Sequence, residues 1–175
     1  MCTLEAFKID LLQLGEGEKT LTLSLDKDYF ESIDAPEVHD GKLTTTLSIR
    51  KTADVYELQI DTQGEVVVTC DLCLDDMTLP VATHDRLLVK LGAVTNAEDE
   101  VVTVDQNEGV LDTSWLVYEF IALAIPIKHV HEPGSCNNAM IDVLEEHSAT
   151  RSDEAEDRET VDPRWEKLKD LKTKI

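Results

Sequence analysis

Four cysteines are the residues best suited to chemistry in this chain of 175 residues, and two of them form a pair. Cys70 and Cys73 are separated by two residues, a spacing that lets two thiolates bind one Zn²⁺ from a tight turn. His131 and Cys136 are candidates for the other two ligands, because the intervening Pro133-Gly134 turn lets both side chains face one ion. The sequence therefore predicts a zinc site with three cysteine ligands and one histidine ligand.

Other interpretations of these residues stay open. The C-x-x-C pair could instead be two small apolar side chains packed at the end of a strand. A redox role is a third alternative, but a reactive thiol needs positive neighbours or a helix N-terminus, and Asp71, Asp75 and Asp76 are negative. His129 could replace His131 as a ligand, although the extended sequence around it favours a position at a strand edge.

The chain is strongly acidic, with 37 Asp and Glu residues against 16 Lys and Arg residues and a formal net charge of −21. Affinity for nucleic acids comes mainly from cations that neutralise phosphates, so we expect weak binding to naked RNA or DNA. The same charge would repel an anionic membrane surface. A basic protein is the partner that this charge favours, although solubility alone would also explain it.

No apolar run approaches the roughly 18–20 residues of a membrane-spanning helix. The first residues lack the basic start and the apolar stretch of a secretory signal. We therefore expect a cytoplasmic protein.

The N-terminal part of the chain shows the alternation of apolar and polar residues that is typical of half-buried strands. Gln63-Gly64 is typical of a two-residue hairpin turn between two such runs. The expected strands lie within residues 21–25, 43–49, 56–60, 66–68, 79–81, 87–91 and 101–104.

A helix is predicted next, beginning at Asp112 or Thr113 and ending at Pro126, because Asp and Thr are common caps and Pro stops a helix. Its expected apolar face consists of Leu116, Phe120 and Leu123, with Trp115 and Ile121 at the margin. One helix after a run of strands predicts an α+β fold. The sheet should be mostly antiparallel, and either curled or closed into a partly open β-barrel, because many short strands need protected edges.

The composition changes towards the C-terminus. Residues 142–161 hold eight acids and two bases with little apolar content, so we expect an acidic disordered linker after a globular domain of residues 1–141. Residues 162–175 hold three acids and five bases. In this segment Trp165, Leu168 and Leu171 would share one face of a helix. This spacing predicts a short amphipathic C-terminal helix that docks on another surface.

Three segments together resemble the YceD-like family of large ribosomal RNA subunit accumulation proteins. They are CDLCLDDMTLPV, VYEFIALAIPIKHVHEPGSC and DPRWEKLKDLK, in that order, and the resemblance covers roughly residues 15–175. Some branches of the family carry a second C-x-x-C after the helix, where this chain has only a histidine and a cysteine. By this resemblance, the residues at motif positions are Cys70, Cys73, Glu119, Pro126, His131 and Cys136.

The resemblance implies help in building the large ribosomal subunit, with accumulation of its large rRNA as the outcome and no established enzymatic activity. From the acidic charge we infer a non-enzymatic factor that binds a basic ribosomal protein of the large subunit. Candidate residues for contacting this partner are Asp71, Asp75, Asp76, Glu119 and Trp165. The alternative is a metal-dependent nuclease or hydrolase in rRNA processing, which would need an open metal position and a polar cleft.

Overall fold

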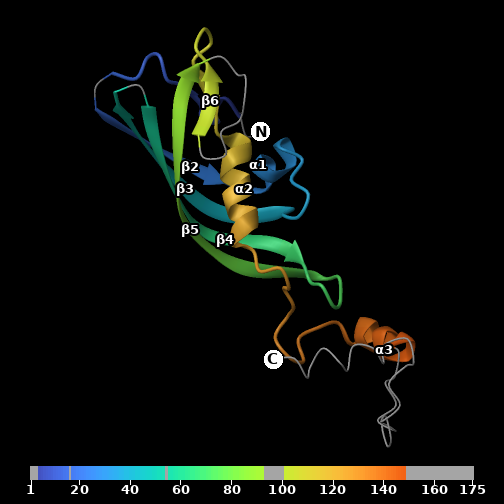
Figure 1. Ribbon diagram of the computed structural model, residues 1–175. Helices are drawn as coiled ribbons and strands as arrows, with labels where there is room; N and C mark the ends of the chain where they lie inside the picture. Colours follow the sequence, from blue (N-terminus) through green and yellow to red (C-terminus); the bar gives the residue numbers. More distant parts are fainter. Residues whose placement is uncertain (1–3, 16, 54, 93–100, 149–175) are drawn as a thin grey trace, which may run out of the picture. The chain divides into compact units, whose positions relative to one another are not determined.

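The computed structural model describes residues 4–15, 17–53, 55–92 and 101–148 (Figure 1). The strands are β1 (Lys8–Asp10), β2 (Glu18–Leu25), β3 (Asp40–Thr52), β4 (Val55–Thr69), β5 (Asp76–Gly92), β6 (Val101–Asp105) and β7 (Val110–Asp112). The helices are the 3-10 helix η1 (Leu4–Phe7) and the α-helices α1 (Lys27–Ser32), α2 (Ser114–Ala124) and α3 (Asn138–His147). The chain divides into two compact units, residues 1–141 and 142–175, and the sheets, α1 and α2 belong to the first.

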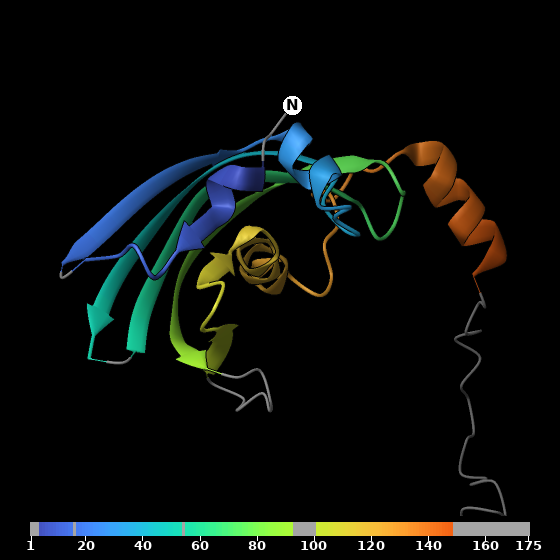
Figure 2. The same ribbon diagram turned by 90° about the horizontal axis from the view of Figure 1, so that it is seen from above.

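Five strands form one sheet in the order β2-β3-β4-β5-β6. Neighbours from β2 to β5 are antiparallel, whereas β6 runs parallel to β5. The sheet curls strongly, and α2 lies on its concave side (Figure 2). The predicted α+β fold with a mostly antiparallel, curled sheet is confirmed. Among the described strands, β2 and β6 remain edges, so the sheet does not close into the alternative barrel.

Helix α2 begins after Thr113 and ends just before Pro126, as predicted. Its predicted face is only partly correct, because Leu116 and Phe120 are partly buried against the core and the most buried side is shifted from them. Val117 and Ile121 are fully buried in the core, whereas Leu123 is 81% exposed. Apolar residues occur on more than one side of this helix, so their spacing does not choose the side that meets the sheet.

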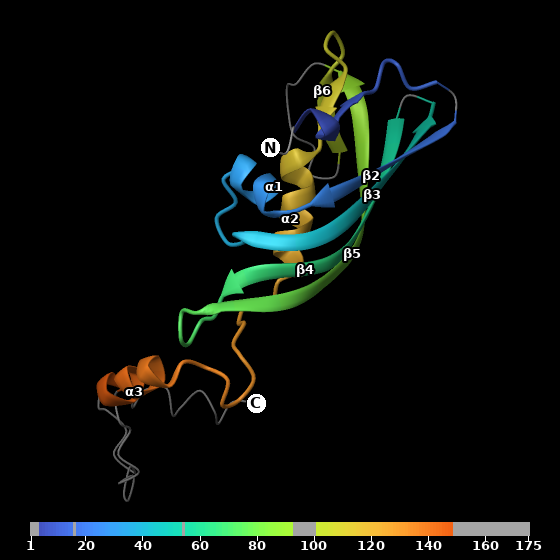
Figure 3. The same ribbon diagram turned by 180° about the vertical axis from the view of Figure 1, so that it is seen from behind.

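Polar groups on the buried side of α2 have hydrogen-bond partners, so their burial does not leave them unsatisfied. The hydroxyl of Tyr29 in α1 donates to the carbonyl of Ser114 at 2.7 Å. The hydroxyl of Tyr118 accepts from the backbone N–H of Glu37 at 3.3 Å. These contacts attach α1 and the loop after it to α2 (Figure 3).

The predicted hairpin turn at Gln63-Gly64 is wrong, because β4 continues through both residues. Gly64 pairs with Leu43 of β3 and Val81 of β5, so it lies in the centre of the sheet. Its φ is +150°, and a Cβ atom there would lie 2.2 Å from the carbonyl oxygen of Lys42. The glycine is therefore needed for the close approach of two strands. The runs 79–81 and 87–91, expected as two strands, likewise belong to the single strand β5.

Helix α3 corrects the start of the predicted disordered linker, because residues 142–147 are helical. The side chain of Asn137 accepts from the backbone N–H of Ala139 at 3.1 Å and caps this helix. The remainder of the predicted linker and the predicted C-terminal helix, including Trp165, lie outside the described residues. None of the described helices is long and apolar enough to cross a membrane.

Candidate metal centre

The loop between β4 and β5 positions the first two cysteines. The N–H of Cys70 donates to the carbonyl of Asp75 at 2.9 Å, and the N–H of Leu74 donates to the carbonyl of Cys70 at 3.0 Å. Leu74 reverses the chain with a φ of +61°. As a result, the side chains of Cys70 and Cys73 turn inwards and are 0% and 1% exposed.

The segment after α2 supplies the other two residues. Pro126 prevents the helix from continuing, and the chain returns towards the β4–β5 loop. A second turn follows, in which Gly134 has a φ of +86° and Ser135 donates to the carbonyl of Glu132 at 2.9 Å. This turn lies between His131 and Cys136, as the Pro-Gly pair predicted.

Three hydrogen bonds attach this segment to the loop. The N–H of Asp71 donates to the carbonyl of His129 at 3.0 Å, and the carboxylate of Asp71 accepts from the N–H of His129 at 2.7 Å. The side chain of Asn137 donates to the carboxylate of Asp75 at 3.2 Å. Cys70 and Cys136, distant in sequence, are thereby held close together. The spacing of the cysteines carried no signal for these supporting contacts.

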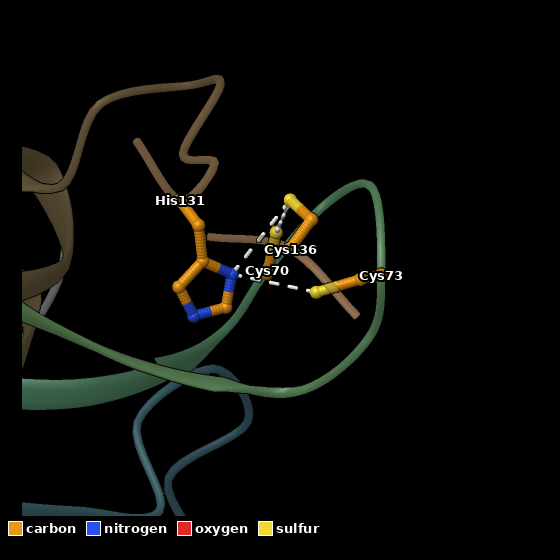
Figure 4. Close-up of side chains that lie close together, drawn as sticks. All are labelled: Cys70, Cys73, His131 and Cys136. Carbon is orange, nitrogen blue, oxygen red and sulfur yellow. Dashed lines mark hydrogen bonds between the residues drawn. The ribbon is translucent and has the colours of Figure 1, made fainter. Parts of the chain in front are cut away.

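The four predicted ligands come together in one cluster (Figure 4). One ligand atom from each of Cys70, Cys73, His131 and Cys136 lies within 4.8 Å of the others. The sulfur of Cys73 is 3.4 Å and that of Cys136 is 3.9 Å from Nδ1 of His131. The sulfurs of Cys70 and Cys136 are 4.0 Å apart.

These separations fit tetrahedral zinc. Zn–S bonds of about 2.3 Å and Zn–N bonds of about 2.0–2.1 Å place two sulfurs about 3.8 Å apart and a sulfur and a nitrogen about 3.6 Å apart. The imidazole of His131 is also oriented correctly. Its Nε2 donates to the carbonyl of Asp76 at 3.3 Å, which leaves Nδ1 free to face the sulfurs. The cluster can therefore hold one tetrahedral metal ion.

The cluster also favours negative charge on one sulfur. Burial raises the pKa of the Cys70 thiol, but backbone N–H groups of Cys73, Leu72 and His131 donate to its sulfur and lower the pKa to about 6. A hydrogen bond with Cys70 raises the pKa of His131. The sequence argument that acidic neighbours disfavour a thiolate missed these backbone donors, because loop geometry places them and residue type does not.

The pKa of the Cys136 thiol shifts in the opposite direction from that of Cys70. Burial, followed by the interactions with Cys70 and Cys73, raises the pKa of the Cys136 thiol to about 11. Thiolates so close together repel one another, and a divalent cation would remove that repulsion. A thiolate at Cys70 is the form that binds a metal ion, and metal binding at this cluster would also require Cys136 to lose its proton.

The remaining predicted residues are placed as follows. His129 does not face the cluster with its ring, since its Nδ1 lies 3.1 Å from the carbonyl oxygen of Pro126. Asp76 is exposed, and one of its carboxylate oxygens lies 3.3 Å from Nε2 of His39. Glu119 accepts from the indole N–H of Trp115 at 2.9 Å on the exposed side of α2.

Comparison with protein families identifies a match. The family model described as large ribosomal RNA subunit accumulation protein YceD matches residues 58–172, a range that includes all four residues of the cluster. No match was found among curated proteins or among solved structures.

Proposed function

Because this chain belongs to the YceD family of large ribosomal RNA subunit accumulation proteins, we propose that it is a non-enzymatic, cytoplasmic factor for assembly of the large ribosomal subunit. In this proposal it binds a basic ribosomal protein and releases that protein to rRNA. The observation that carries the proposal is the net charge of −21 in a member of this family. A protein with this charge is poorly suited to bind rRNA itself.

Complementary charge supports the proposed partner. Ribosomal proteins are cationic, and a net negative surface attracts them over a distance and suppresses wrong partners. Asp71, Asp75 and Asp76 are exposed around the candidate metal centre and belong to this negative surface. Because rRNA is a denser polyanion, it can take the basic protein away from such a carrier.

We also propose that the four-residue cluster holds one structural Zn²⁺. Four protein ligands complete a tetrahedral coordination shell. A hydrolytic metal centre needs a position for water or substrate, which a complete shell does not offer. The donor set thus supports a structural role for the metal and a non-enzymatic role for the protein.

Depletion of the protein in cells tests the function. Large rRNA and large subunits should fall, and small subunits should be spared. Affinity capture of the full chain from native lysate, with one half of the sample treated with RNase, tests the partner. The basic large-subunit protein should be recovered from both halves. Recovery that requires intact RNA would contradict direct binding to a protein.

A further inference from the structure

A groove lies beside the candidate metal centre, with a volume of about 710 Å³. It is lined by the C-terminal end of α2, the segment that follows this helix, the β4–β5 loop and the loop after α1. Figure 1 shows the end of α2 reaching towards the strands that carry this loop. The groove and the candidate metal centre share Cys70, which belongs to the lining of the groove.

The groove is open to solvent, and several of the residues that line it are exposed apolar side chains. Leu74 is 62% exposed, Leu123 is 81% exposed, and Ile127 has an exposure of 103%. Single exposed apolar residues are ordinary, whereas a group of them around one groove makes that groove a candidate for an interaction site.

The conformation of Leu74 strengthens this conclusion. Its φ of +61° lies in the left-handed region, which is unfavourable for leucine and suits glycine or asparagine. A turn that needed only this backbone shape would be better served by glycine. The exposed leucine thus adds side-chain surface to the groove at a cost in backbone strain, and such strain is typical of functional positions.

Carboxylates border the apolar surface. Glu37 and Asp71 line the groove itself. A second hollow of about 390 Å³ shares His39 with it and adds four carboxylates: Glu31, Asp34, Asp40 and Asp76. The lysine among the residues lining this second hollow is Lys27, which pairs with Glu31 at 3.7 Å. The border is therefore strongly negative.

From these observations we infer that the groove docks a cationic peptide segment of the basic partner, with at least two apolar side chains against Leu123 and Ile127. This inference rests on the proposed function and assigns the partner's docking site. The carboxylate border favours lysine and arginine and disfavours phosphate. The exposed apolar side chains of the lining favour a segment that also carries leucine, isoleucine or an aromatic residue.

Variants of the full chain test the inference with one probe, the proteins of the large ribosomal subunit freed of rRNA. The double variant Leu123→Ser/Ile127→Ser should reduce retention of the bound basic protein at least about tenfold, because burial of two large apolar side chains is lost. Val110→Ser is the matched control, since Val110 is 41% exposed and precedes the opposite end of α2. It should leave retention unchanged.

Two further variants separate the contributions of shape and charge. Leu74→Asn should weaken retention and leave the melting temperature unchanged or higher, because asparagine tolerates the left-handed conformation. Asp34→Asn/Glu37→Gln should weaken retention several-fold at low salt, and this difference should shrink as salt rises. Glu18→Gln/Glu108→Gln removes the same charge from exposed positions outside the groove and should have a smaller effect.

The outcomes distinguish this inference from the proposed function. If the wild-type chain retains no basic large-subunit protein, the proposed function fails, and the inference fails with it. If the wild-type chain and Leu123→Ser/Ile127→Ser retain the same protein equally well, only the docking site is wrong. The groove can also be blocked with a synthetic peptide of residues 162–175 or with a second copy of the chain. If the blocked chain still retains the basic protein equally well, the proposed docking site is wrong.

Discussion

Asp71 and His129 form a reciprocal pair of hydrogen bonds, with the backbone of Asp71 donating to the carbonyl of His129 and the carboxylate of Asp71 accepting from its N–H. Each residue lies one or two positions from a member of the candidate metal cluster. The pair therefore links the two halves of the site through protein atoms. In this arrangement Asp71 is a positioning residue.

The first prediction concerns this pair. Asp71→Ala should weaken zinc binding about 10- to 100-fold, the effect typical of losing a supporting contact behind the ligands. Asp71→Asn should retain most of the affinity, because its amide oxygen still accepts from the N–H of His129. Competition with a chromophoric chelator measures both. Glu132→Ala, which removes a nearby exposed carboxylate, is the control. Equal affinities for Asp71→Ala and this control would refute the positioning role.

The second prediction concerns the metal itself. The purified chain should carry one equivalent of zinc, and Cys73→Ser should lose it. Because a structural metal is linked to folding, the variant should melt roughly 10 °C lower, as should the wild-type chain after chelation. Cys2→Ser removes the cysteine that is not among the predicted ligands and should change neither property. Metal-free protein that melts at the same temperature with and without added zinc would contradict the prediction.

The sequence was informative wherever side-chain chemistry acts locally. Spacing was sufficient to bring Cys70 and Cys73 together on one loop, and the Pro-Gly turn did the same for His131 and Cys136. The boundaries of α2 were readable in the same way: the carboxylate of Asp112 accepts from the N–H of Ser114 at the start, and the later proline follows the end. These features depend on a few adjacent residues and are readable without a fold.

Features that depend on tertiary packing were not readable. Gly64 has the sequence environment of a turn, but the backbone of β3 at Lys42 and Leu43 approaches it so closely that no side chain fits. The buried side of α2 includes Ser114 and Tyr118, whose polar groups need partners on α1 and the loop after it. The low pKa of Cys70 depends on backbone donors that only the folded loop aligns.

The third prediction uses Gly64. Gly64→Ala should reduce the free energy of unfolding by at least about 2 kcal/mol, because the new Cβ collides with backbone atoms and the positive φ is unfavourable. Gly15→Ala is the matched control, since nothing lies within 4 Å of a Cβ at that position. Urea denaturation of both variants measures the difference. Similar midpoints would show that β3 and β4 can separate without cost.

The fourth prediction concerns pH. Asp61 and His84 are directly opposite one another on β4 and β5, and the hydrogen bond and the negative charge of Asp61 raise the pKa of His84. A raised pKa means that the folded state binds the proton more tightly than the unfolded state. The stabilisation is therefore complete below the unfolded pKa of about 6.5 and is lost as the pH rises through the folded pKa.

Two measurements check this pair. NMR titration should show the pKa of His84 falling towards its ordinary value in Asp61→Asn. His84→Gln should melt below the wild-type chain only at acidic pH, and the difference should vanish above neutrality. A difference that is constant across this range would mean that His84 contributes by packing and not by charge.

The last prediction concerns release of the partner. Binding to the basic large-subunit protein should weaken at least about tenfold between 0.05 and 0.5 M salt, because exposed charges more than about 10 Å apart are already screened at 0.1 M. Large-subunit rRNA added to the complex should displace the chain, since the rRNA presents a denser array of negative charge to the same cations. Fluorescence anisotropy of the labelled chain follows both reactions. The chain alone should bind the same rRNA weakly at every salt concentration. Tight, salt-resistant binding of the chain to bare rRNA would reverse the proposed order of events, because the rRNA would then be the direct partner.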